Sequence, residues 1–307
     1  MLIFLLKRLA QAIPLLLLVI ICTFLLVHAA PGGPFTSERS VPPQVLAALN
    51  AQYNLDLPIW QQIGLYIGHL LQWDFGPSFK FPGRSVTEMI STGFPLSAEL
   101  SLYALLFAVI LGLPAGILAA YKANTGLDYG PMTVAMLGIC LPSFVLGPLL
   151  TLSFGIGLGW LPVTGWGESS GDKILPAITL GASYAAYLAR IMRGSLIEVL
   201  GQDFIRTARA KGVSEFAVLW RHALRPALPP VISFLGPAVA GLLAGSFVVE
   251  TLFQIPGLGR FFIQAAFNRD YTMVLGTTIF YAALIFGCNI LADLILVWLD
   301  PRQKLHD

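Results

Sequence analysis

The side chains that could act as nucleophiles, bases or metal ligands are few and scattered along this chain. The histidines are His28, His69, His222 and His306, and the cysteines are Cys22, Cys140 and Cys288. A serine hydrolase needs a serine within hydrogen-bond reach of a base, and the stretch Gly181-Ala182-Ser183 has no histidine at a supporting spacing. The cysteines lie in apolar runs without a CxxC pair, which indicates packing and no metal site. Enzyme activity therefore ranks last among the candidate functions.

The composition indicates that lipid is the main solvent of the chain. Hydrophobic residues make up 56% and charged residues 11% of its 307 residues, and the mean hydropathy is +0.78. Soluble domains carry roughly 25% charged residues. The net charge of +2 is small and scattered, which argues against nucleic acid as a partner. We therefore expect an all-α integral membrane protein.

Six apolar runs are long enough to cross roughly 30 Å of hydrocarbon as helices. They cover residues 9–29, 97–120, 132–157, 174–192, 230–251 and 275–298. The first run could instead be a secretory signal, because Lys7 and Arg8 precede it. It is longer than the roughly 7 to 15 apolar residues of such a signal, so we interpret it as a retained anchor.

Basic residues are distributed unevenly between the two sides that these spans define. Of the 18 Lys and Arg residues, twelve fall on the side that holds both termini and six on the other. The twelve are Lys7, Arg8, Lys122, Arg190, Arg193, Arg206, Arg209, Lys211, Arg221, Arg225, Arg302 and Lys304. Because basic loops are retained inside the cell, both termini are predicted to be cytoplasmic.

Two polar segments divide the chain. Residues 1–30 are predicted to form the first transmembrane helix, residues 31–95 a small extracytoplasmic insert, and residues 96–307 the transmembrane core. The insert contains Pro-Gly clusters and an aromatic run at residues 73–79, and it is too short for a separate enzyme domain. The core includes a polar cytoplasmic loop at residues 193–229.

The pattern of this loop predicts two short helices joined by a sharp turn. The first covers residues 196–211. Gly212 follows directly, at the position where a glycine in the left-handed conformation commonly caps the C-terminus of a helix. Ser214 is a candidate N-cap for the second helix, which is expected to end where Arg225 precedes Pro226. The basic residues could simply contact anionic lipid headgroups. Alternatively, the bend could project into a groove on a soluble partner.

The motifs of the loop resemble the EAA loop of ABC-importer permeases, in the form found in the dipeptide, oligopeptide and nickel subfamily. The stretches that carry the resemblance are DFIRTARAKG at residues 203–212 and HALRP at residues 222–226. Where the general motif has Glu-Ala-Ala, this chain has Arg206, Thr207 and Ala208, a departure that is itself similar to the peptide subfamily.

Further stretches extend the resemblance along the whole chain. They are GPSF at residues 76–79, ETLFQIPGLG at residues 250–259 and NRDY at residues 268–271. The stretch APGGPF at residues 30–35 is particularly similar to the B-type subunits of oligopeptide permeases. The resemblance implies the type I ABC-importer permease fold and peptides as the leading cargo class.

The resemblance also implies a set of partners in a bacterial cytoplasmic (inner) membrane. They are a second homologous permease chain, two cytoplasmic ATP-binding subunits, an extracytoplasmic peptide-binding protein, the peptide substrate and membrane lipid. The sequence has no G-x-x-x-x-G-K-[ST] phosphate loop. ATP and Mg are therefore expected on the partner subunits, and no cofactor is expected on this chain.

Three groups of site residues follow from the resemblance and from the spans. Coupling to the ATP-binding subunits is expected at Arg206, Thr207, Ala208, Arg209, Ala210, Lys211, Gly212, Ser214, Glu215 and His222. An outer gate or a contact with the binding protein is expected at Glu250, Gln254, Pro256, Gly257, Arg269 and Asp270. Residues that could line the pathway are Ser143, Ser233, Ser246 and Asn289, although each serine could equally bond to its own helix.

Two other transport functions stay open. A secondary transporter driven by an ion gradient would need polar or charged groups near the membrane midplane, and these are scarce here. Asp293, in the last span, is interpreted as structural because it lies near the cytoplasmic end. Among relatives of the resembling subfamily, nickel or another solute can replace peptide as the cargo.

Overall fold

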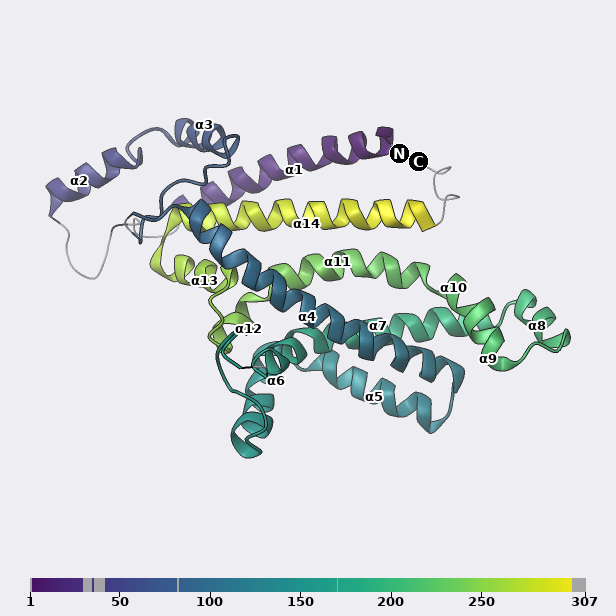
Figure 1. Ribbon diagram of the computed structural model, residues 1–307. Helices are drawn as coiled ribbons and strands as arrows, with labels where there is room; N and C mark the ends of the chain where they lie inside the picture. Colours follow the sequence, from purple (N-terminus) through teal and green to yellow (C-terminus); the bar gives the residue numbers. More distant parts are fainter. Residues whose placement is uncertain (1, 30–34, 36–41, 82, 170, 300–307) are drawn as a thin grey trace. The chain divides into compact units, whose positions relative to one another are not determined.

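The computed structural model describes residues 2–29, 35, 42–81, 83–169 and 171–299 (Figure 1). Within these ranges the regular structure is helical, with one isolated β-bridge between Pro77 and Ser85. The stretch at residues 30–34, together with Arg302, Lys304 and His306, lies outside the described residues. The all-α prediction is confirmed for the part of the chain that the structure describes.

Among the described residues, five helical segments are long and apolar enough to cross a membrane, and a bent pair of helices supplies a sixth candidate. The five are α1 (Leu2–Ala29), α4 (Val86–Tyr121), α7 (Ile174–Leu200), α11 (Pro229–Gly245) continued by α12 (Phe247–Leu252), and α14 (Tyr271–Leu299). Their positions match five of the six predicted runs. Since α4 begins at Val86, its helix starts well before the predicted boundary at residue 97.

The predicted span at residues 132–157 is not one straight helix. It consists of α5 (Gly126–Cys140), followed by α6 (Ser143–Leu150) and the π-helix η1 (Thr151–Gly157), with a bend of 111°. Pro142 causes the break, because a proline ring excludes the preceding residue from the helical region. Leu141 is accordingly extended, with φ −88° and ψ 113°. The Pro142 carbonyl then accepts the N–H groups of Val145 and Leu146 and starts α6.

The chain forms two compact units. One contains residues 1–97 and 256–286, and the other contains residues 98–255 and 287–307. The first unit includes two short helices of the insert, α2 (Pro43–Gln52) and α3 (Ile59–Leu70), and also α13 (Leu258–Asn268). Its core is formed by Phe75, Val86, Met89, Leu258 and Met273, with a second cluster that joins α1, α3 and α14.

The second unit is organised around α7. Gly112 and Gly116, one turn apart on α4, allow the two backbones to approach closely, as small residues do in membrane helix pairs. A Cβ on either glycine would lie 2.5 Å from a carbonyl oxygen of α7, that of Ala185 or Ala189. Helices α5 and α11 also pack against α7. A displacement of α7 would therefore affect most of this unit.

The remaining helices of the second unit belong to the polar loop. They are α8 (Asp203–Ala210), α9 (Glu215–Ala217), the π-helix η2 (Val218–Ala223) and α10 (Leu224–Ala227). We call residues 203–223 the elbow.

Candidate functional site

The first helix of the elbow is separate from α7. The sequence predicted one helix over residues 196–211, but α7 ends at Leu200 and α8 begins at Asp203. Gln202 breaks the helix between them, because its backbone is extended, with φ −77° and ψ 155°. The prediction of one continuous helix is therefore wrong, and α8 is a separate helix from α7.

The turn after α8 has the predicted left-handed cap. Gly212 has φ +80°, a conformation that glycine adopts without steric cost. Its N–H donates to the Arg209 carbonyl at 2.9 Å, and the N–H of Val213 donates to the Ala208 carbonyl at 3.2 Å. These two bonds are those of a Schellman motif. Ser214 then accepts the N–H of Ala217 at 3.4 Å, so its predicted N-cap role is confirmed.

The second predicted helix of the polar loop does not end at Arg225 as predicted. Helical backbone continues through the π-helix η2 and through α10 to Ala227. An α-helical Pro226 would clash with the carbonyl four residues earlier, at His222. The wider π turn immediately before α10 relieves this clash, which explains how the helix passes the proline.

One side of the elbow is anchored to α7. Ile205, Val218 and Ala223 are fully buried in a cluster that includes Leu188 and Met192 of α7. Burying an Ile or Val side chain contributes about 1.5–3 kcal/mol. Ala208, one of the predicted coupling residues, belongs to this buried side, and His222 is half-buried. The elbow and α7 are therefore held together as one packed body.

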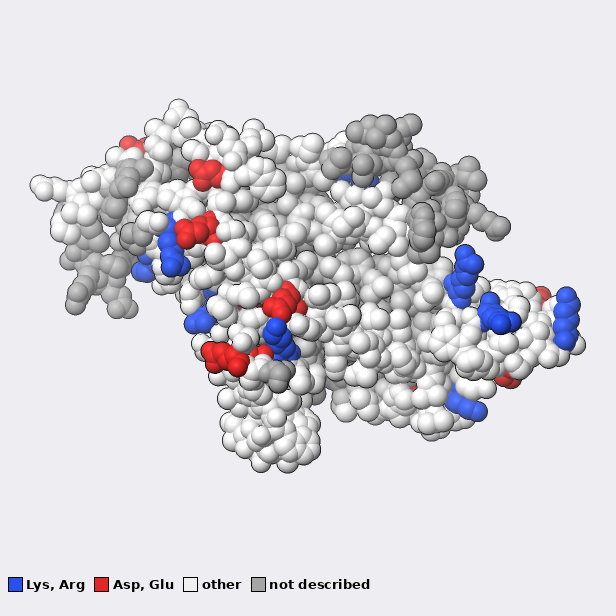
Figure 2. All heavy atoms as spheres, in the orientation of Figure 1, with Lys and Arg blue, Asp and Glu red and all other residues white. Residues whose placement is uncertain are grey.

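The opposite side of the elbow is exposed and carries basic residues, which gather over α8 to α10 in Figure 2. The exposed predicted coupling residues are Arg206, Thr207, Arg209, Ala210, Lys211, Gly212, Ser214 and Glu215. Arg209 donates two hydrogen bonds to Glu215, at 2.8 and 3.1 Å, across the turn. Since both side chains are about half exposed, this pair shapes the surface more than it stabilises the fold.

Three exposed aromatic residues of the elbow were not identified from the sequence. Phe204, Phe216 and Trp220 are 42%, 72% and 49% exposed. The rings of Phe216 and Trp220 contact each other, with centroids 6.0 Å apart. Phe216 and Trp220 are four residues apart in a segment rich in charge, and this spacing was the signal in the sequence that could have identified them. Exposed aromatic and Arg side chains are typical of protein interfaces.

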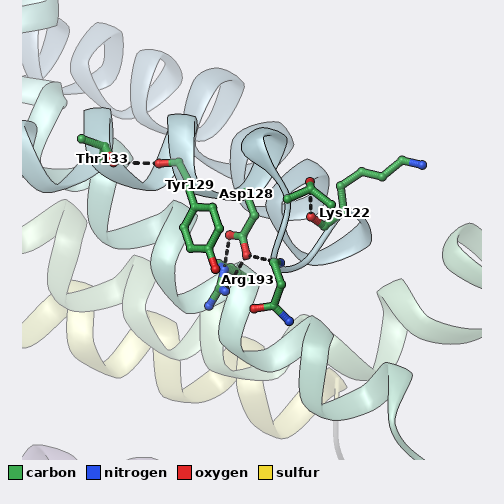
Figure 3. A network of polar contacts seen from close by, with 7 residues as sticks. Lys122, Asp128, Tyr129, Thr133 and Arg193 are labelled. Carbon is green, nitrogen blue, oxygen red and sulfur yellow. Dashed lines mark hydrogen bonds and ion pairs between the residues drawn. The ribbon is translucent and has the colours of Figure 1, made fainter.

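An ion pair with a buried carboxylate joins α5 to α7 (Figure 3). The Asp128 side chain is 1% exposed, and its oxygens accept from Arg193 Nε at 2.6 Å and Nη2 at 2.7 Å. The N–H of Asn124 donates to the same carboxylate at 2.8 Å. Arg193 was predicted to belong to the polar loop, and no local pattern in the sequence indicates the role of Asp128. The pair fixes the beginning of α5 relative to α7.

A second carboxylate organises the unit that holds the insert. Asp270 is 1% exposed and accepts from the Ser78 hydroxyl, from the N–H of Phe79 at 3.1 Å and from the N–H of Met273 at 3.2 Å. Thr272 Oγ1 donates to the Pro77 carbonyl at 2.6 Å. We call Ser78, Phe79, Asp270, Thr272 and Met273 the Asp270 cluster. It joins two of the stretches that carried the family resemblance, at residues 76–79 and 268–271.

The other residues predicted for an outer gate differ in backbone conformation and in burial. Arg269 caps α13 with a left-handed backbone, at φ +57°, and Gln254 is likewise left-handed at φ +60°. Glu250 is fully buried and accepts from the Ser246 hydroxyl at 2.6 Å. Pro256 is exposed and Gly257 is buried. Their role as a gate stays a prediction.

The candidate pathway residues differ in exposure and in their hydrogen bonds. Ser246 is buried beside Glu250, and Ser233 is exposed but donates to the Pro229 carbonyl of its own helix at 2.9 Å. Ser143 and Asn289 are partly exposed. Ser233 therefore shows the alternative bond within its own helix, and lining roles for all four stay predictions.

A polar contact holds the loop that precedes α7. Glu99 of α4 accepts from the Lys173 ammonium and from Trp166 Nε1, the latter at 3.1 Å. The hydrogen bond to Glu99 raises the pKa of Lys173. The ammonium also lies 5.3 Å from the ring centroids of Tyr103 and Trp166. Lys173 therefore stays charged and links the loop to α4.

The sequence matches a family model over residues 112–305, that of the binding-protein-dependent transport system inner membrane component. This range includes the elbow, and the chain belongs to this family. It is accordingly a multi-pass membrane protein and a transport component, whose family operates with ATP-binding and substrate-binding partners.

Relatives of similar length make the comparison more specific. The chain is 48% identical to the oligopeptide transport system permease protein OppB of Haemophilus influenzae, over 99% of this chain and 100% of the relative. It is 47% identical to OppB of Salmonella typhimurium with the same coverage. It is 43% identical to the dipeptide transport system permease protein DppB of Bacillus subtilis, over 99% of this chain and 98% of that protein.

Solved structures agree on the fold. The MetNI methionine ABC transporter in an inward-facing conformation matches with a TM-score of 0.59 at 17% identity, over 69% of this chain and 96% of that chain. An amino acid ABC transporter matches with a TM-score of 0.52 at 17% identity, over 70% and 94%. At this identity the likeness concerns the fold alone, and it confirms the predicted importer-permease fold.

Proposed function

We propose that this chain is the permease subunit of an ATP-driven importer that moves di- or oligopeptides into the cytoplasm by alternating access. The observation that carries the proposal is the full-length similarity, at 43–48% identity, to relatives that are named as oligopeptide and dipeptide permeases. The elbow supports it, because its exposed basic and aromatic side suits a protein partner.

The proposed assembly contains a second homologous permease chain, two cytoplasmic ATP-binding subunits and an extracytoplasmic peptide-binding protein, in a lipid bilayer. ATP and Mg would be held by the ATP-binding subunits. The excess of basic residues on the side of the termini supports a bacterial inner-membrane protein with both termini in the cytoplasm. The elbow lies in a loop on that same predicted side, where the ATP-binding subunits would be.

In this proposal, the elbow transmits movement from the ATP-binding subunits to the spans. Force on the exposed side of α8 would be carried to α7 through the packed side chains of Ile205 and Ala208. Helix α7 contacts α5 and α11, and Arg193 fixes it to α5 through Asp128. ATP binding can shift the equilibrium between the inward-facing and outward-facing states only by its difference in affinity for them.

The test is peptide uptake by the complete complex in proteoliposomes, measured together with ATP hydrolysis. Gly212→Val places a β-branched side chain at φ +80° and deforms the turn of the elbow. We expect uptake of a labelled tripeptide to fall by about tenfold or more, which corresponds to about 1.4 kcal/mol or more. Insertion and residual ATP hydrolysis should persist.

The matched control is Gly194→Val, because Gly194 is exposed on α7 with ordinary helical backbone and no atom near a Cβ. Uptake in this control should stay within about twofold of wild type. Unchanged uptake in Gly212→Val would refute the coupling role. Uptake that requires an ion gradient without ATP would favour the secondary transporter, and uptake of nickel without peptide would reassign the cargo.

A further inference from the structure

The unit that holds the insert contains a cavity of ≈ 160 Å³ that the proposed transport function does not use. Phe24 and His28, in the last two turns of α1, line it together with Tyr271 and Leu275, in the first two turns of α14. Helix α3 and the segments at residues 53–55 and 74–79 supply the remaining walls. Since α1 and α14 are both candidate spans, the cavity lies at a membrane boundary.

Aromatic rings form a continuous chain around the cavity. In order of contact, they belong to Tyr53, Phe79, Tyr271, His28, Phe24 and Tyr66. The centroids of successive rings lie between 4.4 and 6.5 Å apart. A wall of this kind attracts cations, because the faces of aromatic rings carry partial negative charge, and quaternary or primary ammonium groups are recognised by such rings.

The formal charge of the lining is negative. Asp74 is the only Asp, Glu, Lys or Arg among the described residues that line the cavity. One of its oxygens accepts the N–H of Gly76 at 2.9 Å, and the other lies 3.4 Å from His69 Nδ1. A carboxylate has about four acceptor positions, so Asp74 can accept from a further donor. The cavity therefore suits a cation and disfavours a free anion.

Tyr66 adds a polar group without a partner. The residue is 8% exposed, and its hydroxyl has no hydrogen-bond partner among the described residues. Burial, with a smaller contribution from the negative charge of Asp74, raises the pKa of this hydroxyl, so it stays protonated. Buried hydroxyl groups are normally paired, and an unpaired one beside a cavity points to a missing ligand or water.

We propose that this cavity binds a small organic ammonium group, with the aromatic rings around it, Asp74 as its counter-charge and the Tyr66 oxygen as an additional acceptor. Two sources share this chemistry. One is the headgroup of phosphatidylethanolamine, which the position at the membrane boundary makes accessible. The other is a free amine in the aqueous phase.

The test uses the full-length chain in phosphatidylglycerol nanodiscs, with saturation binding of radiolabelled ethylammonium. We expect Asp74→Asn to weaken binding by about tenfold, because it removes the counter-charge and keeps an acceptor for Gly76. Tyr66→Phe should weaken binding by about threefold while it preserves the ring. The matched control is Asp56→Asn, an exposed acid of the same insert that does not line the cavity, and it should leave affinity unchanged.

A second arm distinguishes the sources. Half of the phosphatidylglycerol is replaced by phosphatidylethanolamine, and lipid retained by the purified chain is identified by native mass spectrometry. The site is supported and assigned to the lipid if phosphatidylethanolamine competes with ethylammonium. The same holds if the purified chain retains phosphatidylethanolamine and Asp74→Asn abolishes this retention. Saturable ethylammonium binding without competition supports the site and assigns it to a free amine. The proposal is overturned if neither ethylammonium nor phosphatidylethanolamine binds, or if Asp74→Asn binds as well as wild type. These measurements do not depend on peptide transport.

Discussion

The hydrogen bonds that shape the elbow join residues at most six positions apart, whereas those that Asp270 accepts from Ser78 and Phe79 join residues about 190 positions apart. The elbow leaves its charged groups exposed, and the Asp270 cluster buries a carboxylate. An exposed side can bind a partner without cost to the fold. A buried carboxylate with several donors instead holds distant segments together, because removing it leaves those donors unpaired.

The largest expected effect is on the stability of the protein, when the buried carboxylate of Asp270 is removed. Asp270→Ala removes the acceptor of the Ser78 and Thr272 hydroxyls and of three backbone N–H groups, those of Phe79, Lys80 and Met273. We expect the free energy of unfolding to fall by about 3 kcal/mol or more, from roughly 1 kcal/mol or more for each unpaired buried donor. It can be measured by SDS titration in mixed micelles. Asp56→Ala serves as the control, and equal stability of the two variants would contradict the structural role of Asp270.

An intermediate effect on binding is expected at the exposed aromatic pair of the elbow. Replacing Phe216 and Trp220 together by Ala should raise the dissociation constant for the ATP-binding subunits by about tenfold, as for interface anchors. The stability of the chain itself should change by less than about 0.5 kcal/mol. Phe267→Ala, at an aromatic residue that is 86% exposed on α13, is the control. Unchanged affinity of the double variant would place the interface elsewhere.

The smallest effect is expected for the ion pair across the elbow turn. A double-mutant cycle of Arg209→Ala and Glu215→Ala should give an interaction free energy of about 0.5 kcal/mol or less, because both side chains are about half exposed. The same SDS titration measures it. A value near that expected for the Asp270 cluster would mean that the elbow is rigid because of its surface charges and not because of its buried side.

The local features of the site could be predicted from the sequence. The left-handed cap at Gly212 and the N-cap at Ser214 follow from residue types a few positions apart, and both are confirmed. The break between Leu200 and Asp203 was missed, because no proline marks it. The passage of the helix through Pro226 was missed for the opposite reason, since a proline is normally read as a helix end.

The long-range features could not be predicted. Asp128 and Arg193 are 65 positions apart, and Ser78 and Asp270 are 192 apart. The sequence shows that these groups are polar but not which of them meet, because pairing depends on how the helices pack. The same holds for Gly112 and Gly116 of α4, since only the contact with α7 explains why a side chain is excluded at these two positions.

By itself, the sequence determined that the chain is a helical membrane protein with an elbow between two spans, because hydropathy, helix periodicity and caps act over one or a few turns. Only the tertiary structure decided that the third predicted span bends by 111°, that Asp128 and Asp270 are buried with their partners, and that an aromatic cavity forms at the ends of α1 and α14. These features depend on contacts between segments that are distant in the chain, and a local sequence pattern does not predict such contacts.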